Sequence, residues 1–180
     1  MDAVKIIQGT AVPLDRSDVD TDQIIPAEWL KRVERTGFGV GLFSAWREKE
    51  RDFVLNRAEH AGATVLVAGP NFGVGSSREQ AAAALLALGV GCIVAVSFAR
   101  IFYRNAINLG LPVLACRTAR EIPSGARLRV DPAAGEVTEV ASGRAHRCEP
   151  IPGHLLDMIA DGGLLPHLER RLSLRKEMSS

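Results

Sequence analysis

The stretch from Ala63 to Cys116 constrains the fold most, because apolar runs and helical patterns alternate there with short links. Three apolar runs are typical of buried strands, and two amphipathic or alanine-rich runs are typical of helices that end at a glycine. These five runs cover residues 63–69, 77–89, 92–97, 98–110 and 112–116. A strand–helix–strand–helix–strand order with short links predicts a parallel sheet with right-handed crossovers.

The flanking segments predict further elements around this unit. An apolar run at residues 3–7 suits a strand, and two alternating runs at 126–131 and 135–140 predict a hairpin. Residues 27–33 suit a short helix, residues 42–56 are expected to be partly helical, and residues 154–163 and 164–178 predict two terminal helices. With 180 residues, 47% of them apolar, the chain is expected to form one domain.

Charge and hydropathy exclude several classes of function. The formal net charge is +1, so no basic excess favours nucleic acid. No apolar window reaches the roughly 18 residues that a membrane span needs. The start, MDAVKIIQGT, has no basic segment before a long apolar run, so we expect no signal peptide and a cytoplasmic location.

The three cysteines, Cys92, Cys116 and Cys148, are far apart in the sequence. An odd and sparse set argues against a disulfide framework, and without a C-x-x-C pair no zinc or iron–sulfur site is expected within the chain. Cys92 and Cys116 lie in apolar runs, so we expect both to be small core side chains.

The loop NFGVGSSRE, residues 71–79, permits two interpretations. Ser76 with Glu79, or Ser77 with Gln80, fits a helix capping box, and the loop glycines allow a tight turn. Alternatively, free backbone N–H groups at the helix start and the Arg78 guanidinium form an anion site at the carboxyl end of a strand. The pattern alone leaves both interpretations open.

Known phosphate and nucleophile motifs do not fit this loop. The P-loop lysine is absent, and Arg78 stands where a dinucleotide fingerprint needs a third glycine. No glycine follows either serine at the spacing of a nucleophile elbow, and no histidine is near in sequence. A serine here acts as a base only if donors stabilise its alkoxide.

The acidic loop DRSDVDTDQ spaces Asp18, Asp20 and Asp22 alternately, like the start of a calcium loop. The glycine and the terminal glutamate of such a loop are missing, so we expect the acids to form turns or to pair with arginines. Arg16 is either a salt-bridge partner of these acids or a group that faces a substrate acid.

Two blocks of the sequence carry a family resemblance. GVGSSREQAAAA and VSFARIFYRNAINLGLP resemble the swivelling domain of the aconitase superfamily, and DVDTDQIIPAEWLKRVERTGFGVGLF resembles the small-subunit family of bacterial 3-isopropylmalate dehydratases. The resemblance implies an α/β fold over residues 1–180, a single three-layer β/β/α swivelling domain with a central, mainly parallel sheet.

The resemblance also implies an activity. Members are small subunits of a two-chain hydro-lyase that isomerises 2-isopropylmalate to 3-isopropylmalate by dehydration and rehydration in leucine biosynthesis. The partner large subunit carries a 4Fe-4S cluster, and the small subunit carries no cofactor. We therefore expect this chain to be inactive until it meets its large subunit.

Site roles follow from the resemblance, motif by motif. Ser76 matches the catalytic base, Ser77 and Arg78 match residues that bind a substrate carboxylate, and Arg16 lies where related enzymes have another carboxylate-binding arginine. The substrate-specificity loop matches the segment containing Trp29, Leu30, Lys31 and Arg32, and core packing is the alternative for its apolar members.

Two departures leave alternatives open. Gln80 stands where a histidine is common, and the C-terminal segment is more like that of shorter family members. A related dehydratase of the homoaconitate, citraconate or dimethylmalate type therefore stays an alternative, as does a non-catalytic carboxylate-binding domain.

Overall fold

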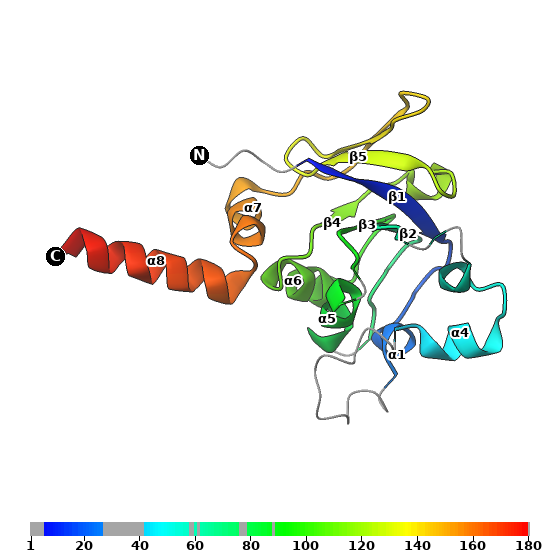
Figure 1. Ribbon diagram of the computed structural model, residues 1–180, viewed down its shortest axis with the longest axis horizontal. Helices are drawn as coiled ribbons and strands as arrows, with labels where there is room; N and C mark the ends of the chain where they lie inside the picture. Colours follow the sequence, from blue (N-terminus) through cyan, green and yellow to red (C-terminus); the bar gives the residue numbers. More distant parts are fainter. Residues whose placement is uncertain are drawn as a thin grey trace.

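The computed structural model describes residues 6–26, 42–57, 60, 62–75, 79–87 and 89–179. The helix expected at residues 27–33 and the glycine-rich loop from Thr36 to Gly41 lie outside these ranges. Figure 1 shows a sheet with helices packed along one side and a long C-terminal helix that extends away from the body.

A seven-stranded sheet with the order β4-β3-β2-β1-β5-β6-β7 forms the centre of the molecule. Its first four strands are parallel, and the three of them that lie between Ala63 and Cys116 confirm the predicted unit, because each falls within a predicted apolar run. The four strands are β1 (Ile7–Leu14), β2 (Val65–Ala68), β3 (Cys92–Ala95) and β4 (Val113–Ala115). Every residue of β2 and β3 is buried, as expected for a parallel sheet covered on both faces.

β1 starts later and runs further than predicted, since the expected apolar run covers residues 3–7 and the strand covers Ile7–Leu14. The strand pairs with β5 through residues 7–10 and with β2 through residues 11–14. Ala11 donates its N–H to the Ala126 carbonyl on the β5 side at 2.9 Å. Pro13, two residues on, faces the same side, where the pairing with β5 has ended, so its missing N–H costs no ladder bond.

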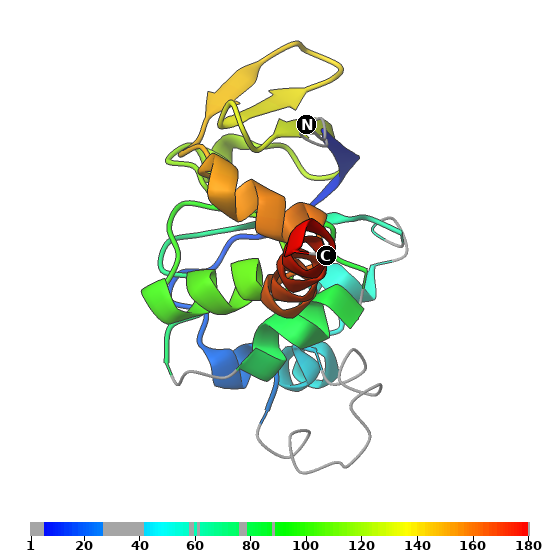
Figure 2. The same ribbon diagram turned by 90° about the vertical axis from the view of Figure 1, so that its left-hand side faces the viewer.

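The other half of the sheet is antiparallel and consists of β5 (Arg127–Asp131), β6 (Glu136–Glu139) and β7 (Ala145–Arg147). The β5–β6 hairpin confirms the prediction, and Gly135 takes the positive φ of +69° that its turn requires. β7 was not predicted. Figures 1 and 2 both place this half at one end of the molecule and the short helix α1 (Thr21–Ile24) at the other.

Two helices cover the parallel strands, as predicted: α5 (Glu79–Ala87) and α6 (Arg100–Asn108). α5 buries Ala81, Ala82, Ala84 and Leu85, so its small side chains let it lie close to the sheet. Gly89 and Gly110 follow the two helices with φ values of +92° and +87°, which confirms both as C-terminal glycines.

The remaining described helices lie around the body, except that the last one extends away from it. They are α4 (Ser44–Lys49), α7 (Gly153–Ala160), α8 (Leu164–Ser179) and the 3-10 turns η2 (Val54–Asn56) and η4 (Ala119–Glu121). α4, α7 and α8 confirm the expected helical segments. Across the described ranges, no helix combines the length and the apolar character needed to cross a membrane.

Candidate functional site

The carboxyl ends of the four parallel strands lead into loops at one edge of the sheet, where open α/β folds bind ligands. The loop after β2 runs to Gly75 and continues into the serine segment. Ser76, Ser77 and Arg78 themselves lie outside the described residues, as does the predicted specificity segment with Trp29, Leu30, Lys31 and Arg32. Their assigned roles therefore stay predictions, while the approach to the serine segment can be described.

Backbone hydrogen bonds hold one side of this approach against the loop after β1. Gly73 donates its N–H to the Val19 carbonyl at 2.7 Å, and the Val74 carbonyl accepts from the Thr21 N–H at 2.9 Å. Asp20 and Val74 form an isolated parallel bridge. The pairing of β1 with β2 is thus resumed beyond the strand ends.

The loop after β3 holds the other side. Phe72 donates its N–H to the Ser97 carbonyl at 3.0 Å, and the Phe72 carbonyl accepts from the Ala99 N–H at 2.9 Å. The Ser97 hydroxyl also accepts from the Asn71 N–H at 2.8 Å. Because both edges are bonded, the chain enters the serine segment from a fixed position at Gly75.

Gly73 is required by the packing as well as by its conformation. Its φ is +86°, and a Cβ atom built there would overlap the ring of Phe102. That ring packs edge-on against Phe72, with the ring centroids 5.2 Å apart. The sequence predicted a tight turn at the loop glycines, and the positive φ values of Gly73 and of Gly75, at +113°, confirm it.

The acids of the loop after β1 have structural partners. Asp20 caps α1: its Oδ1 accepts from the Gln23 N–H at 2.8 Å, and the Gln23 Oε1 accepts from the Asp20 N–H at 3.0 Å. Asp18 accepts from the Asn71 side-chain amide at 3.0 Å, and Asp15 pairs with Arg120 at 2.8 Å. The prediction of turns or arginine pairs is confirmed for Asp20 and Asp15, whereas Asp18 pairs with an asparagine.

Arg16 forms an ion pair with Glu50 and stacks on an aromatic ring. Its guanidinium carbon lies 4.1 Å from the centroid of the Trp46 ring, a distance typical of a cation–π contact. Arg16 is therefore a salt-bridge partner, which was one of its two predicted roles, but its partner is Glu50 and not an acid of its own loop. The centroid of the Phe53 ring lies 5.4 Å from the same guanidinium carbon, and 33% of the Arg16 side chain stays exposed.

A cleft of about 940 Å³ opens beside the carboxyl ends of β3 and β4. Ser97 lines it and also bonds the serine-loop approach, so the cleft adjoins that loop. Among the described residues of its wall, three arginines, Arg100, Arg117 and Arg147, face one glutamate, Glu149. No sequence pattern predicted this cleft, because part of its wall lies at the end of the unpredicted strand β7 and just after it.

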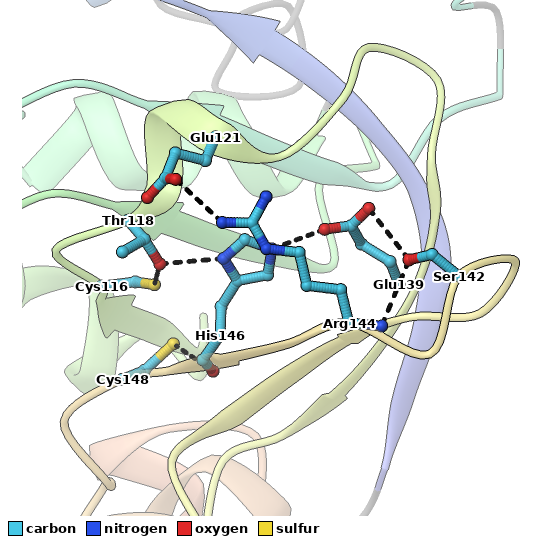
Figure 3. Close-up of polar contacts among 8 residues, drawn as sticks. All are labelled: Cys116, Thr118, Glu121, Glu139, Ser142, Arg144, His146 and Cys148. Atoms are coloured by element: carbon cyan, nitrogen blue, oxygen red, sulfur yellow. Dashed lines mark hydrogen bonds and ion pairs between the residues drawn. The ribbon is translucent and has the colours of Figure 1, made fainter.

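A buried polar cluster lies behind the cleft (Figure 3). The His146 side chain is 2% exposed, with Nε2 2.7 Å from a Glu139 carboxylate oxygen and Nδ1 2.8 Å from the Thr118 hydroxyl. The Cys116 sulfur lies 3.6 Å from the same hydroxyl. Cys116 is buried as predicted, but it lies beside polar groups rather than among apolar ones alone.

Comparison with known proteins identifies the class of protein to which this fold belongs. Residues 1–118 match the family model described as the aconitase C-terminal domain. The solved structure of 3-isopropylmalate dehydratase from Methanocaldococcus jannaschii superposes with a TM-score of 0.82 at 36% identity, covering 97% of this chain and 99% of that one. The α/β swivelling fold implied by the sequence resemblance is thereby confirmed.

Curated relatives narrow the assignment. The chain is 46% identical over 179 residues to a 3-isopropylmalate dehydratase small subunit of Parafrankia sp., covering 98% of this chain and 91% of that one. A small subunit of Frankia alni is 52% identical over 145 residues, covering 76% of this chain and 74% of that one. The chain belongs to the 3-isopropylmalate dehydratase small-subunit family.

Proposed function

We propose that this chain is the small subunit of a cytoplasmic two-chain hydro-lyase that isomerises 2-isopropylmalate to 3-isopropylmalate by dehydration and rehydration in leucine biosynthesis. The observation that carries the proposal is the near-full-length similarity to small subunits of this enzyme, including 46% identity over 179 residues. The fixed approach to Ser76 at the carboxyl edge of the sheet supports the same role.

Ser76 takes the proton from the substrate carbon in this proposal. A serine hydroxyl is a weak base, so its alkoxide requires backbone N–H donors and a nearby cation. Ser76 directly follows Gly75, which the flanking loops hold in place, and α5 starts three residues later at Glu79. Ser77 and Arg78 bind a substrate carboxylate, and the planar guanidinium suits two parallel hydrogen bonds.

The large subunit is the partner, and its 4Fe-4S cluster supplies the Lewis acid that a leaving hydroxyl needs. The cysteines of this chain do not fit as cluster ligands. Cys92 is enclosed in β3, and within the described part of the chain no three side chains of histidine, cysteine, aspartate or glutamate are arranged so that they could hold a metal ion. The small dicarboxylate substrate therefore lies between the two subunits.

The segment with Trp29, Leu30, Lys31 and Arg32 selects the substrate side chain in this proposal, since an isopropyl group requires an apolar contact surface. A related dehydratase acting on homoaconitate, citraconate or dimethylmalate has the same carboxylate chemistry and differs at this segment. Substrate competition distinguishes these members.

Reconstitution tests the assignment. The chain alone and the large subunit alone are expected to leave 2-isopropylmalate unchanged, and the mixture is expected to convert it to 3-isopropylmalate, because base and Lewis acid lie on different chains. Turnover is followed by chromatography of the two isomers, with homoaconitate and citraconate as competing substrates. If the enzyme prefers a competing substrate, the chain is the small subunit of the dehydratase that acts on that substrate.

Arg16→Gln tests the second carboxylate contact. Loss of a charged hydrogen bond costs about 1.5–3 kcal/mol, so KM is expected to rise roughly 10- to 150-fold in the reconstituted enzyme. Glu50→Gln is the matched control, because it removes the ion pair but keeps the cation over Trp46. If both variants keep the original KM, Arg16 has only the structural role.

A further inference from the structure

Cys116 and Cys148 meet at the wall of the cleft although they are far apart in the sequence. Cys116 follows β4 and Cys148 follows β7, and the Glu149 N–H donates to the Ala115 carbonyl at 2.8 Å, which ties the two segments together. Figure 3 shows both sulfur atoms beside His146, where the Cys148 thiol donates to the His146 carbonyl at 3.8 Å. Cys116 is buried, whereas Cys148 is partly exposed and lines the cleft.

A chain of polar contacts leads from Cys116 into the buried cluster. The Cys116 sulfur, the Thr118 hydroxyl, the His146 ring and the Glu139 carboxylate follow one another at 3.6, 2.8 and 2.7 Å. The hydroxyl can accept from the thiol while it donates to Nδ1, and Nε2 then donates to the carboxylate. A proton can therefore leave the thiol through Thr118 to the ring.

The two thiols differ in acidity. The neighbouring Cys148 thiol, followed by Thr118, lowers the pKa of Cys116 to about 6 against the effect of burial. The Cys116 thiol, together with burial, raises the pKa of Cys148. Cys116 is thus the more acidic of the two, and Cys148 becomes the nucleophile only when its own proton has passed to Cys116.

The cleft in front of Cys148 favours anions. Arg100, Arg117 and Arg147 line the same cleft as Cys148, and Glu149 is the single acid on the described wall. Its volume of about 940 Å³ is at the upper end of the range for small-molecule sites. An anionic peptide disulfide fits both the charge and the size.

We propose that Cys116 and Cys148 are a dithiol site that reduces anionic low-molecular-weight disulfides bound in this cleft and closes into a reversible internal disulfide. The Cys148 thiolate attacks one sulfur of the bound disulfide, and the first thiolate leaves and takes a proton. Cys116 then loses its proton through Thr118, and the Cys116 thiolate attacks the Cys148 sulfur and releases the second thiolate, which takes up that proton. One dithiol and one disulfide thus become one protein disulfide and two free thiols.

Intact-mass measurement of the full chain with excess oxidised glutathione tests the proposal. The chain is expected to lose about 2 Da and to keep no adduct, because the second attack expels glutathione. Cys116→Ser is expected to retain one adduct of about 305 Da on Cys148, since the resolving thiol is gone. Cys148→Ser is expected to stay unmodified, because the remaining Cys116 is buried. An unmodified wild-type chain, or a stable adduct on it, overturns the proposal.

Two further variants separate this chemistry from general thiol reactivity. Cys92→Ala is the matched control: Cys92 is enclosed in β3, burial raises its pKa to about 12, and its loss is expected to change neither the mass shift nor the rate. The double variant Arg117→Gln with Arg147→Gln is expected to slow the reaction with oxidised glutathione at least about tenfold but not with cationic cystamine. Equal slowing with both reagents contradicts an anion-selective cleft.

Discussion

Ser76→Ala is expected to lower kcat for 2-isopropylmalate at least about 10³-fold in the reconstituted two-chain enzyme. A positioned general base contributes a factor of roughly 10²–10⁴ to the rate, and the residues that bind the substrate carboxylate act together with it. The substrate KM is expected to change little, since the hydroxyl acts on the carbon-bound proton. Steady-state kinetics with purified large subunit measures both constants.

The neighbouring hydroxyl provides the matched control. Ser77→Ala removes a hydroxyl of the same size from the same segment. Because the Ser77 hydroxyl is assigned to bind a substrate carboxylate, this variant is expected to raise KM more than it lowers kcat. Size-exclusion chromatography of each mixture is expected to show unchanged association with the large subunit. Equal kinetic effects of the two variants contradict separate roles for the two serines.

Gly73→Ala is expected to destabilise the chain by about 3 kcal/mol, which corresponds to a fall of about 9 °C in Tm for a chain of this length. Two costs add: a non-glycine residue at positive φ, and overlap of the new Cβ with the Phe102 ring. Since Phe102 packs against Phe72, the overlap also displaces the approach to Ser76. Thermal unfolding and urea titration measure the loss.

Gly62→Ala separates the two costs. Gly62 has a similar φ of +80°, but a Cβ atom there meets nothing within 4 Å. Its substitution is therefore expected to cost about 1 kcal/mol, from backbone strain alone. If the two alanine variants unfold at the same temperature, the overlap with Phe102 adds no measurable cost to Gly73→Ala, and the close-packing argument is wrong.

The alternating unit from Ala63 to Cys116 was predictable because its signals are local. Continuous apolar runs mark β2 and β3, and Gly89 and Gly110 mark the helix ends by their freedom to adopt positive φ. The hairpin around Gly135 was predictable for the same reason. The serine segment was found by its motif, and its family is confirmed by the comparisons.

Features made by long-range contact were not predictable. β7 has only three residues, and its single buried side chain, His146, gives no strand pattern. The contacts of His146 with Thr118 and Glu139 join positions 28 and 7 residues away, so nothing local predicts them. The role of Asp20 as a helix cap could have been found from the Gln23 that follows three residues later.

Deuterium incorporation tests the central claim, that Ser76 of this chain moves the carbon-bound proton. The reconstituted enzyme is incubated with 2-isopropylmalate in D₂O, and recovered substrate and product are analysed by mass spectrometry. Wild-type enzyme is expected to incorporate deuterium at carbon. The Ser76→Ala enzyme is expected to bind substrate with an unchanged Kd and to incorporate none, and incorporation at the wild-type rate would contradict the account.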